Sequence, residues 1–237
     1  MTPALRIISS MATKQLLADL VALYQQCQRQ SNPKSPPQEI ALESVGGVDA
    51  AKRVQAGEAF DIVALASNAI DQLIAAGKVV AGSRVDIVNS GVAVAVQAGT
   101  AHPDISTEAA VKQAVLSAPT LGYSTGPSGV QLAILFERWG IAAQIQNRIV
   151  TAPPGVPVGS LVAKGEVALG FQQLSELVNL PGIDVLGPLP PAIQITTTFS
   201  AGMAATSTEP EAVRALLAFF ASPATVDTKR RNGMEAV

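Results

Sequence analysis

The chain repeats one local pattern that limits its fold more than any other feature of the sequence. A short β-branched or apolar run leads through a serine or glycine step into an amphipathic helix, which a glycine ends. Residues 5–8 begin the first repeat, and Ser10 is the predicted N-cap of its helix. Two further repeats occupy residues 40–57 and 61–77. Consecutive βα repeats of this kind predict a parallel sheet flanked by helices.

The pattern changes at Val85, after which an alternating apolar run without a helical step predicts a strand that crosses out of the first lobe. A second set of βα units follows, and a Thr-rich run at residues 193–203 predicts the strand that returns. We therefore expect an α/β fold of two lobes, each a mostly parallel sheet flanked by helices, joined by two crossing strands. The predicted boundaries are 1–84 plus 195–237 for lobe 1 and 85–194 for the inserted lobe 2.

Composition narrows the chemistry that the chain can perform. Of its 237 residues 48% are hydrophobic and 14% charged, with a net charge of −2, so a large core is expected and electrostatic binding of nucleic acid is not. One cysteine, Cys27, and one histidine, His102, are too few for a disulfide or for a zinc or haem site. We expect no metal and no cofactor, so hydroxyls, amides and carboxylates must supply the chemistry.

Three predicted strand-to-helix junctions consist almost entirely of small residues. They are Ser9-Ser10, residues 44–47 (Ser-Val-Gly-Gly) and residues 124–129 (Ser-Thr-Gly-Pro-Ser-Gly). In open α/β sheets, ligands bind beyond the carboxyl ends of parallel strands, where each helix N-terminus carries about half a positive charge. Helix capping alone explains any one of these junctions. The three together predict a site for a small anion.

Sequence signatures of other ligands and reactions are missing. The chain has no G-x-x-x-x-G-K-[ST] motif, no G-x-G-x-x-G after its first strand and no G-x-S-x-G elbow. His102 stands beside Pro103 in a polar loop, a poor position for a catalytic base. Nucleotide binding and serine hydrolase chemistry are therefore disfavoured.

The order of the small-residue motifs resembles that of one known family. The motifs are Ser9-Ser10, residues 44–47 before a helix ending at residues 55–58 (Gln-Ala-Gly-Glu), residues 61–63 (Asp-Ile-Val) and residues 164–170 (Lys-Gly-Glu-Val-Ala-Leu-Gly). Together they resemble the molybdate-binding-protein-like branch of the type II periplasmic solute-binding proteins, over essentially the whole chain. The resemblance implies two α/β lobes that close on a small solute in the cleft between them.

The resemblance also implies which residues contact the ligand. It places second-lobe contacts near residues 124–129, 154–158 and 172–173. The expected ligand-binding residues are Ser9, Ser10, Ser44, Gly46, Gly47, Ser124, Thr125, Ser128, Gly129, Val156, Gln172 and Gln173. Molybdate binders of this type carry a tyrosine where this chain has Gln173, and glycines replace their second serine. These departures imply a ligand larger and less symmetrical than a tetrahedral oxyanion, such as an organic carboxylate.

An enzyme on the same fold is the alternative hypothesis. The broader family includes members similar to aconitate isomerase, which shift a proton along an unsaturated tricarboxylate. Such a reaction needs a base and a stabiliser of enolate-like charge, and helix N-termini at Ser10 and Gly47 can supply the second. Glu43, Asp49 and Tyr123 are candidate bases, and the catalytic residues stay unassigned.

Three basic side chains are candidates for pairing with a carboxylate ligand. Lys14 and Arg53 lie in the first turns of helices that begin at the predicted site, and Arg84 lies beside the first crossing. A solvated helix face explains Lys14 and Arg53 more simply, because long charged side chains are mostly exposed. For Arg84 both interpretations stay open.

Location and partners follow from what the chain lacks. No basic segment followed by a long apolar run opens the sequence, so no secretory signal is visible, and glycines, prolines and polar residues interrupt each long uncharged stretch. We expect no transmembrane segment, a periplasmic protein if a signal peptide was trimmed, and otherwise a cytoplasmic one. The expected partners are a small anion and, if the protein is exported, an ABC permease. A ligand-sensing domain of a regulator is disfavoured, because no helix-turn-helix is attached.

Overall fold

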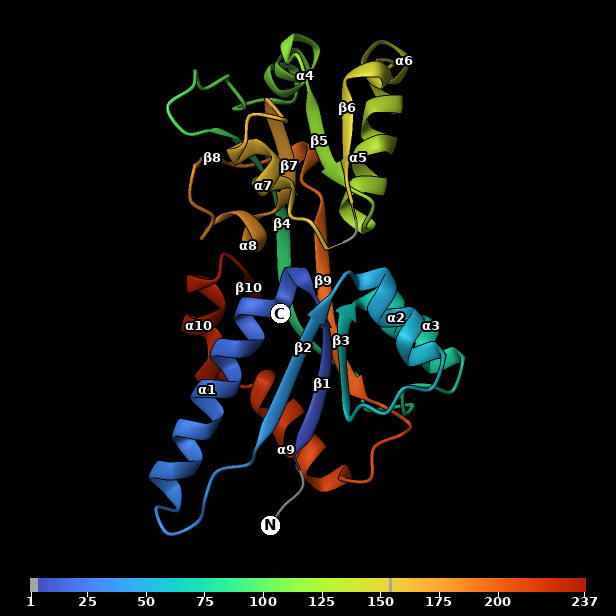
Figure 1. Ribbon diagram of the computed structural model, residues 1–237, viewed down its shortest axis with the longest axis vertical. Coiled ribbons are helices and arrows are strands. Elements are labelled where there is room, and N and C mark those ends of the chain that lie inside the picture. The colour runs from blue at the N-terminus through green and yellow to red at the C-terminus, as the bar shows by residue number, and fades with distance from the viewer. Residues whose placement is uncertain (1–3, 154) are drawn as a thin grey trace. The chain divides into compact units, whose positions relative to one another are not determined.

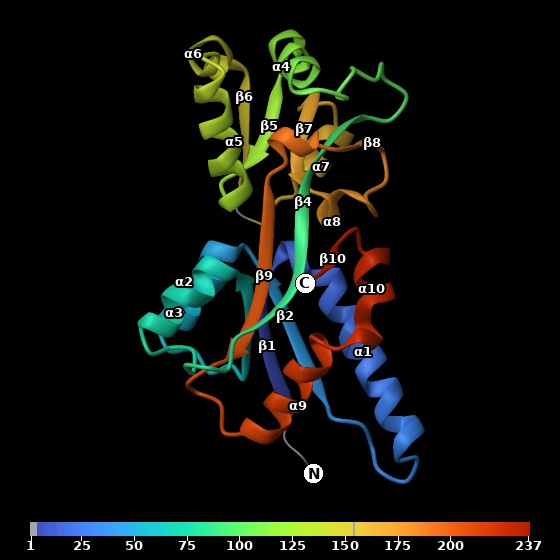
Figure 2. The same ribbon diagram turned by 180° about the vertical axis from the view of Figure 1, so that it is seen from behind.

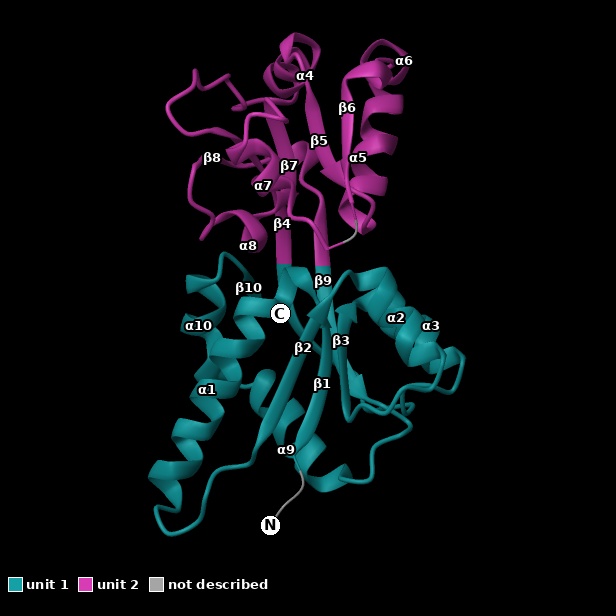
Figure 3. Cartoon of the chain, in the orientation of Figure 1, with its two compact units in different colours: residues 1–89, 198–237 teal, residues 90–197 magenta. Residues whose placement is uncertain are grey.

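The computed structural model describes residues 4–153 and 155–237 (Figure 1). The chain divides into two compact units, residues 1–89 with 198–237 (unit 1) and residues 90–197 (unit 2) (Figure 3). Strand β4 (Val85–Gln97) carries the chain out of unit 1, and β9 (Thr196–Met203) carries it back. Both boundaries fall inside long strands, where the alternation of side chains continues without a mark in the sequence.

Unit 1 is built on the sheet order β2-β1-β3-β9. The parallel strands are β1 (Leu5–Ser10), β2 (Ile40–Val45) and β3 (Ile62–Ala66), and β9 runs antiparallel to β3. The short β10 (Glu235–Ala236) pairs with β4. Its helices are η1 (Met11–Thr13), α1 (Lys14–Ser31), α2 (Gly47–Gln55), α3 (Ser67–Ala75), α9 (Pro210–Phe220), η4 (Pro223–Thr225) and α10 (Val226–Arg231).

Helices cover both faces of the unit 1 sheet, with α2 and α3 on one side and α1, α9 and α10 on the other (Figures 1 and 2). Ile7 packs with Leu17 and Phe220 in the core of the α1 side, whereas Ile8 packs with Val54 and other residues of the α2 side. Because side chains alternate along a strand, β1 points Ser9 towards the α1 side and Ser10 towards the α2 side.

Unit 2 has the sheet order β4-β7-β5-β6, with β8 (Ile183–Pro188) also paired to β4. Strands β5 (Leu121–Ser124), β6 (Ile149–Ala152) and β7 (Leu169–Gln173) are parallel, and β4 is antiparallel to β7. Its helices are α4 (Glu108–Ser117), α5 (Pro127–Arg138), α6 (Ala142–Ile145), η2 (Gln146–Arg148), α7 (Val158–Ala163), α8 (Leu174–Leu177) and η3 (Pro191–Ile193). Each unit thus has three parallel strands flanked by helices, with an antiparallel strand on one side of them, which confirms the predicted α/β fold of both lobes.

Local predictions held where a local signal determined the conformation. Gly57, the predicted left-handed cap of α2, has φ +85°, a value that glycine adopts without strain. Ser10 is the N-cap of η1, the short turn before α1, whereas the N-cap of α1 itself is Thr13. The Ser10 side chain makes no capping hydrogen bond, and its Oγ lies 3.4 Å from Thr13 Oγ1. The Ser10 hydroxyl is therefore not committed to a backbone N–H of the helix start.

Within the described residues, no helix combines the length and the apolar character that crossing a membrane requires.

Candidate functional site

The carboxyl ends of β1 and β2 in unit 1 bring two predicted serines into contact. Ser9 pairs with Ser44 in the parallel register, and their Oγ atoms lie 2.7 Å apart. Ser9 is fully buried, while Ser44 is partly accessible. Each hydroxyl has one proton and two lone pairs, so the pair retains hydrogen-bonding capacity after bonding to each other. At these strand ends the accessible Ser44 hydroxyl is therefore oriented by its hydrogen bond with the buried Ser9 hydroxyl.

Ser10 and the start of α2 lie together on the other side of the same strand ends. A Cβ placed on Gly47 would lie 3.6 Å from Ser10 Cβ, so these two residues are neighbours. Gly46 is the N-cap of α2 and has no side chain to bond the first N–H groups of the helix. The first turn of a helix leaves its N–H groups without partners inside the helix, and they attract anions. Two groups of donors thus lie at these strand ends, Ser9 with Ser44 on one side and Ser10 with Gly46 and Gly47 on the other. We refer to them together as the donor cluster of unit 1.

The junction between β5 and α5 in unit 2 is closely packed. Gly126 is the N-cap, and Ser128, in the first turn, is only 6% exposed. A Cβ on Gly129 would lie 1.7 Å from Ser124 O, so no larger residue fits there without moving the loop. Thr125 is exposed at the tip. The structure therefore gives Gly129 a packing role, beside the open N-terminus of α5.

Gln173 ends β7 and carries a buried oxygen without a hydrogen-bond partner. Strand β7 (Leu169–Gln173) ends with two glutamines, whose amides are buried and bonded to other elements. Gln173 is 4% exposed, and its Nε2 donates to Thr197 Oγ1 at 2.9 Å. Its Oε1 bonds to nothing among the described residues. An unpaired buried oxygen of this kind costs free energy, so it marks a place where a bound group can donate.

Ser90 was not predicted and lies on the same face as Gln173. Gln173 pairs with Val92 of β4, and Ser90 precedes Val92 by two residues. On its other side β4 neighbours β9, and the Val92 N–H donates to Ile195 O at 3.0 Å just before β9 begins. Because β4 and β9 run in opposite directions, a step of two residues along each strand places Ser90 opposite Thr197. Ser90 is fully buried, and its Oγ has no partner within the described part of the chain. In the sequence, Ser90 can be noticed only as a polar residue at one of the alternate positions that the buried valines of β4 occupy.

Gln172 points to the opposite face, and other parts of unit 2 engage both ends of its amide. Its Oε1 accepts from the Gly159 N–H at 3.2 Å, and its Nε2 donates to Glu176 Oε2 at 2.8 Å. Burial raises the pKa of Glu176 to about 7, and the hydrogen bond from Gln172 opposes that rise. Val156, just before α7, is 37% exposed, and Pro154 of the predicted contact range lies outside the described residues.

The structure gives two of the basic candidates other partners. The Arg53 guanidinium bonds to both Glu43 and Glu58, and it holds the pKa of each carboxyl below the usual range. Arg84 bonds to Asp71 and Asp86 in the same way. Both arginines are thus engaged by carboxylates of unit 1.

The remaining chemical candidates differ in their surroundings. Lys14 is exposed, as a solvated helix face would have it. Glu43 is a poor base, because Arg53 stabilises its ionised form. Tyr123 is partly buried, which raises the pKa of its phenol, and its ring packs against Phe136. Among the described residues, no three His, Cys, Asp or Glu side chains are grouped to hold a metal ion.

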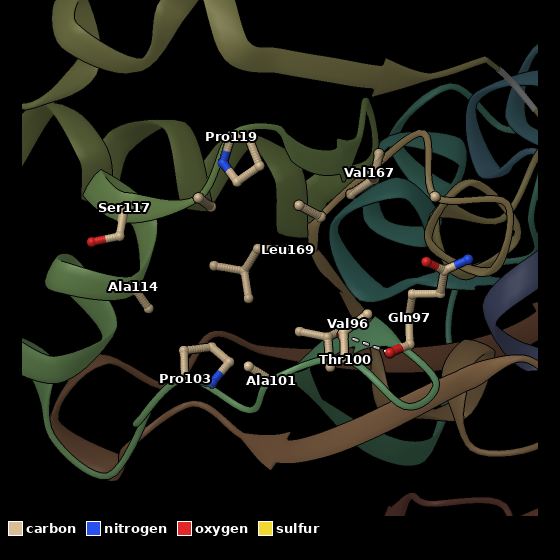
Figure 4. Close-up of a pocket in the computed structure, with 13 residues that line it drawn as sticks. Val96, Gln97, Thr100, Ala101, Pro103, Ala114, Ser117, Pro119, Val167 and Leu169 are labelled. Atoms are coloured by element: carbon tan, nitrogen blue, oxygen red, sulfur yellow. Dashed lines mark hydrogen bonds between the residues drawn. The ribbon is translucent and has the colours of Figure 1, made fainter.

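A hollow in unit 2 lies at the other end of the sheet (Figure 4). It has a volume of about 440 Å³ and is lined largely by apolar side chains, including Val96, Pro119, Val167 and Leu169. Leu169 begins β7, whereas Gln172 and Gln173 end it. The hollow is therefore separate from the candidate ligand-binding residues.

Comparison with known proteins identifies the family. The model of the bacterial extracellular solute-binding proteins matches residues 5–235. The chain belongs to this family. This solute-binding protein is 41% identical over 186 residues to a Pseudomonas sp. protein named aconitate isomerase, a match that covers 78% of this chain and 71% of that one.

Solved structures agree on the fold at low sequence identity. The periplasmic molybdate-binding protein of Azotobacter vinelandii matches with a TM-score of 0.76 and 18% identity, covering 97% of this chain and 98% of the other. A sulfate-binding protein of Mycobacterium tuberculosis H37Rv has a TM-score of 0.76 and 14% identity, over 99% and 87% of the two chains. The solute-binding protein therefore has the type II periplasmic-binding-protein fold, as the motif order predicted.

Proposed function

We propose that this protein binds a small organic carboxylate at the carboxyl ends of its parallel strands. The observation that carries the proposal is the donor cluster of unit 1, in which the Ser9 and Ser44 hydroxyls lie 2.7 Å apart and Ser10 is a neighbour of Gly47 at the start of α2. Hydroxyls and N–H groups at a helix start can hold an anion without a basic side chain. Proteins of the same fold are named for molybdate and sulfate binding, and one was solved with L-phospholactate bound.

Unit 2 supports an organic ligand over an inorganic oxyanion. The proposed contacts there are Ser124, Thr125, Ser128 and Gly129 at the start of α5, Val156 before α7, and Gln172 and Gln173 at the end of β7. One end of the buried Gln173 amide is engaged by Thr197, and the other end has no partner among the described residues, so it can bond to a polar group of an organic ligand. An organic acid offers both a carboxylate and further groups of a different kind, which a tetrahedral oxyanion lacks.

The binding proposal is tested by thermal unfolding with molybdate, sulfate, citrate, cis-aconitate and trans-aconitate added separately. A ligand at 100 times its dissociation constant stabilises the folded state by about 2.7 kcal/mol. We expect an organic carboxylate to raise the melting temperature and molybdate to raise it less. The absence of a shift with every anion would contradict the proposal.

A second candidate function is the isomerisation of small unsaturated carboxylates. The observation that favours it is the 41% identity to a protein named aconitate isomerase, against 10–18% for eight solved proteins of the same fold. Incubation with cis-aconitate or trans-aconitate in deuterated water, followed by NMR, separates the two functions. A binder leaves both acids unchanged, whereas an isomerase interconverts them, whether or not deuterium enters the carbon-bound positions.

We further propose that the protein works outside the cytoplasm and delivers its ligand to an ABC permease. The family description, bacterial extracellular solute-binding protein, supports this location. Cell fractionation after expression of the complete gene in its own host tests the location. Recovery of the protein in the cytoplasm alone would contradict it.

A further inference from the structure

We propose that Glu176 is the catalytic residue that moves the proton in this isomerisation, and that Gln172 is the residue that positions it. The inference rests on the second proposed function. Glu176 lies in α8, which begins directly after Gln173 at the carboxyl end of β7. It therefore stands at the edge of the unit 2 sheet where ligands of open α/β folds bind.

The Gln172 amide fixes the orientation of this carboxyl group. The Gly159 N–H, in the first turn of α7, can only donate, so the Gln172 atom that it contacts at 3.2 Å must be the carbonyl oxygen. The amide NH₂ is then directed at Glu176, where it donates to Oε2 at 2.8 Å. One carboxyl oxygen is thus held by a defined donor, and Oε1 has no side-chain partner among the described residues. This arrangement leaves Oε1 for a proton of a substrate.

The elements packed against Glu176 present no positively charged side chain to its carboxyl group. Helix α8 packs on β7 and β8, and β7 and the neighbouring α7 contain no titratable side chain. The titratable group of β8 is Asp184, which accepts from His102 and from the Gly99 N–H. Because no cation faces it from these elements, burial dominates and raises the pKa of Glu176 to about 7.

A carboxyl group with such a pKa suits proton transfer near neutral pH. General acid–base catalysis is most efficient when the pKa of the catalytic group is close to the working pH. The pKa values of Glu43, Glu58 and Glu108 are all lowered by bonded arginines or other donors, which makes these groups weak bases. Glu176 combines a raised pKa with partial access to solvent, since the residue as a whole is half-buried.

One carboxylate is enough for the complete reaction. Glu176 removes a proton from the methylene carbon next to the C=C bond, and the electrons of that C–H bond form the new C=C bond. The electrons of the old double bond move to the former vinylic carbon, which takes the proton back from the Glu176 carboxylic acid. Glu176 ends as the carboxylate it began as, and no oxidant, reductant or cofactor is consumed. The adjacent substrate carboxylates carry the transient negative charge, which hydrogen-bond donors stabilise.

The test compares the wild type with Glu176→Gln, Glu176→Asp and Gln172→Leu, using cis-aconitate and trans-aconitate as substrates. Glu166→Gln is the matched control, because Glu166 is an exposed carboxylate of the same unit. We expect Glu176→Gln to lower kcat by roughly 100-fold to 10,000-fold, the range typical of general acid–base catalysis, with little change in affinity for the acid by calorimetry. Glu166→Gln keeps the wild-type kcat.

Two further readouts separate catalysis from a structural role. Wild-type kcat/KM should rise with pH through a midpoint near 7, and Gln172→Leu should move that midpoint to higher pH, because Gln172 stabilises the ionised form. Glu176→Asp retains a carboxyl group but withdraws it from the substrate, so kcat should fall by about 100-fold, as displacements of about 1 Å can cause. If Glu176→Gln proves unfolded, Glu176→Asp decides the question.

The outcomes distinguish the two proposals. A wild type that does not interconvert the two acids ends the isomerase function and the role of Glu176 with it. An active wild type with a Glu176→Gln or Glu176→Asp variant within tenfold of its kcat overturns the role of Glu176 alone. A loss confined to KM would also overturn it, since it would assign Glu176 to binding.

Discussion

Ser9 and Ser44 stand opposite each other in the parallel pairing of β1 and β2, with their hydroxyl oxygens 2.7 Å apart. The two residues are far apart in the chain, yet both precede a helix start that is made of small residues. Ser10 continues β1 on the other face, where Gly47 is its neighbour. The donors of unit 1 therefore come from two βα junctions that the sheet holds in register.

The Ser10 hydroxyl should contribute directly to ligand affinity. Its side chain makes no capping bond, so Ser10→Ala should leave the free energy of unfolding nearly unchanged. Loss of a hydrogen bond to a charged ligand should weaken binding by about 1.5 to 3 kcal/mol in calorimetry. Ser35→Ala, in the exposed loop after α1, is the control and should bind normally. Equal affinity of the Ser10→Ala variant and the wild type would remove Ser10 from the site.

Two glycine substitutions should have opposite consequences. In Gly47→Ala the added Cβ meets Ser10 Cβ at 3.6 Å, an ordinary contact, so the fold should keep its melting temperature while the methyl group blocks access to the start of α2. In Gly129→Ala the Cβ would lie 1.7 Å from Ser124 O, so the melting temperature should fall by several degrees. Calorimetric unfolding and ligand titration of both variants check this contrast. A Gly47→Ala variant with full affinity would place the ligand elsewhere.

The unpaired hydroxyl of Ser90 should cost stability in the absence of ligand. Ser90→Ala removes a buried oxygen that lacks a partner, and we expect the free energy of unfolding to rise by about 1 kcal/mol in denaturant titrations. Ser200 provides the matched control, because it is also fully buried but donates to Asp86 at 2.6 Å. Ser200→Ala should therefore lower stability. If Ser90→Ala were as destabilising as Ser200→Ala, Ser90 would have a partner in solution.

Stability should fall with rising pH because of Glu176. The pKa of this carboxyl is about 7 in the folded protein, above the 4.5 of an ordinary glutamate, so the folded state binds the proton more tightly than the unfolded state. Its contribution is fully present below pH 4.5 and is lost as pH rises through 7, by roughly 3 kcal/mol at most at 1.36 kcal/mol per pKa unit. Denaturant titrations of the wild type and Glu176→Gln between pH 4.5 and 8 measure this difference. Parallel curves for the two proteins would show that Glu176 has an ordinary pKa.

Local patterns in the chain were enough for the βα repeats of unit 1 and for the small-residue junctions at the ends of their strands. The repeats predicted at residues 40–57 and 61–77 each form a strand followed by a helix, and Gly57 has the expected left-handed conformation. The sequence also predicted the strand-to-helix junctions of small residues at Ser9-Ser10 and residues 44–47. Each of these features depends on side-chain periodicity or on the backbone freedom of neighbouring residues, which are properties of a short segment.

Contacts between distant segments decided the rest. The pairing of Arg53 with Glu43 and Glu58, which engages a predicted cation and a predicted base, depends on how α2 lies against β2. The raised pKa of Glu176 depends on its burial beside Gln172. The lack of partners for Ser90 Oγ and Gln173 Oε1 depends on the register of β4 with its neighbouring strands. Burial, pairing and the lack of a partner arise only when the folded chain surrounds a group, so no stretch of sequence around that group contains them.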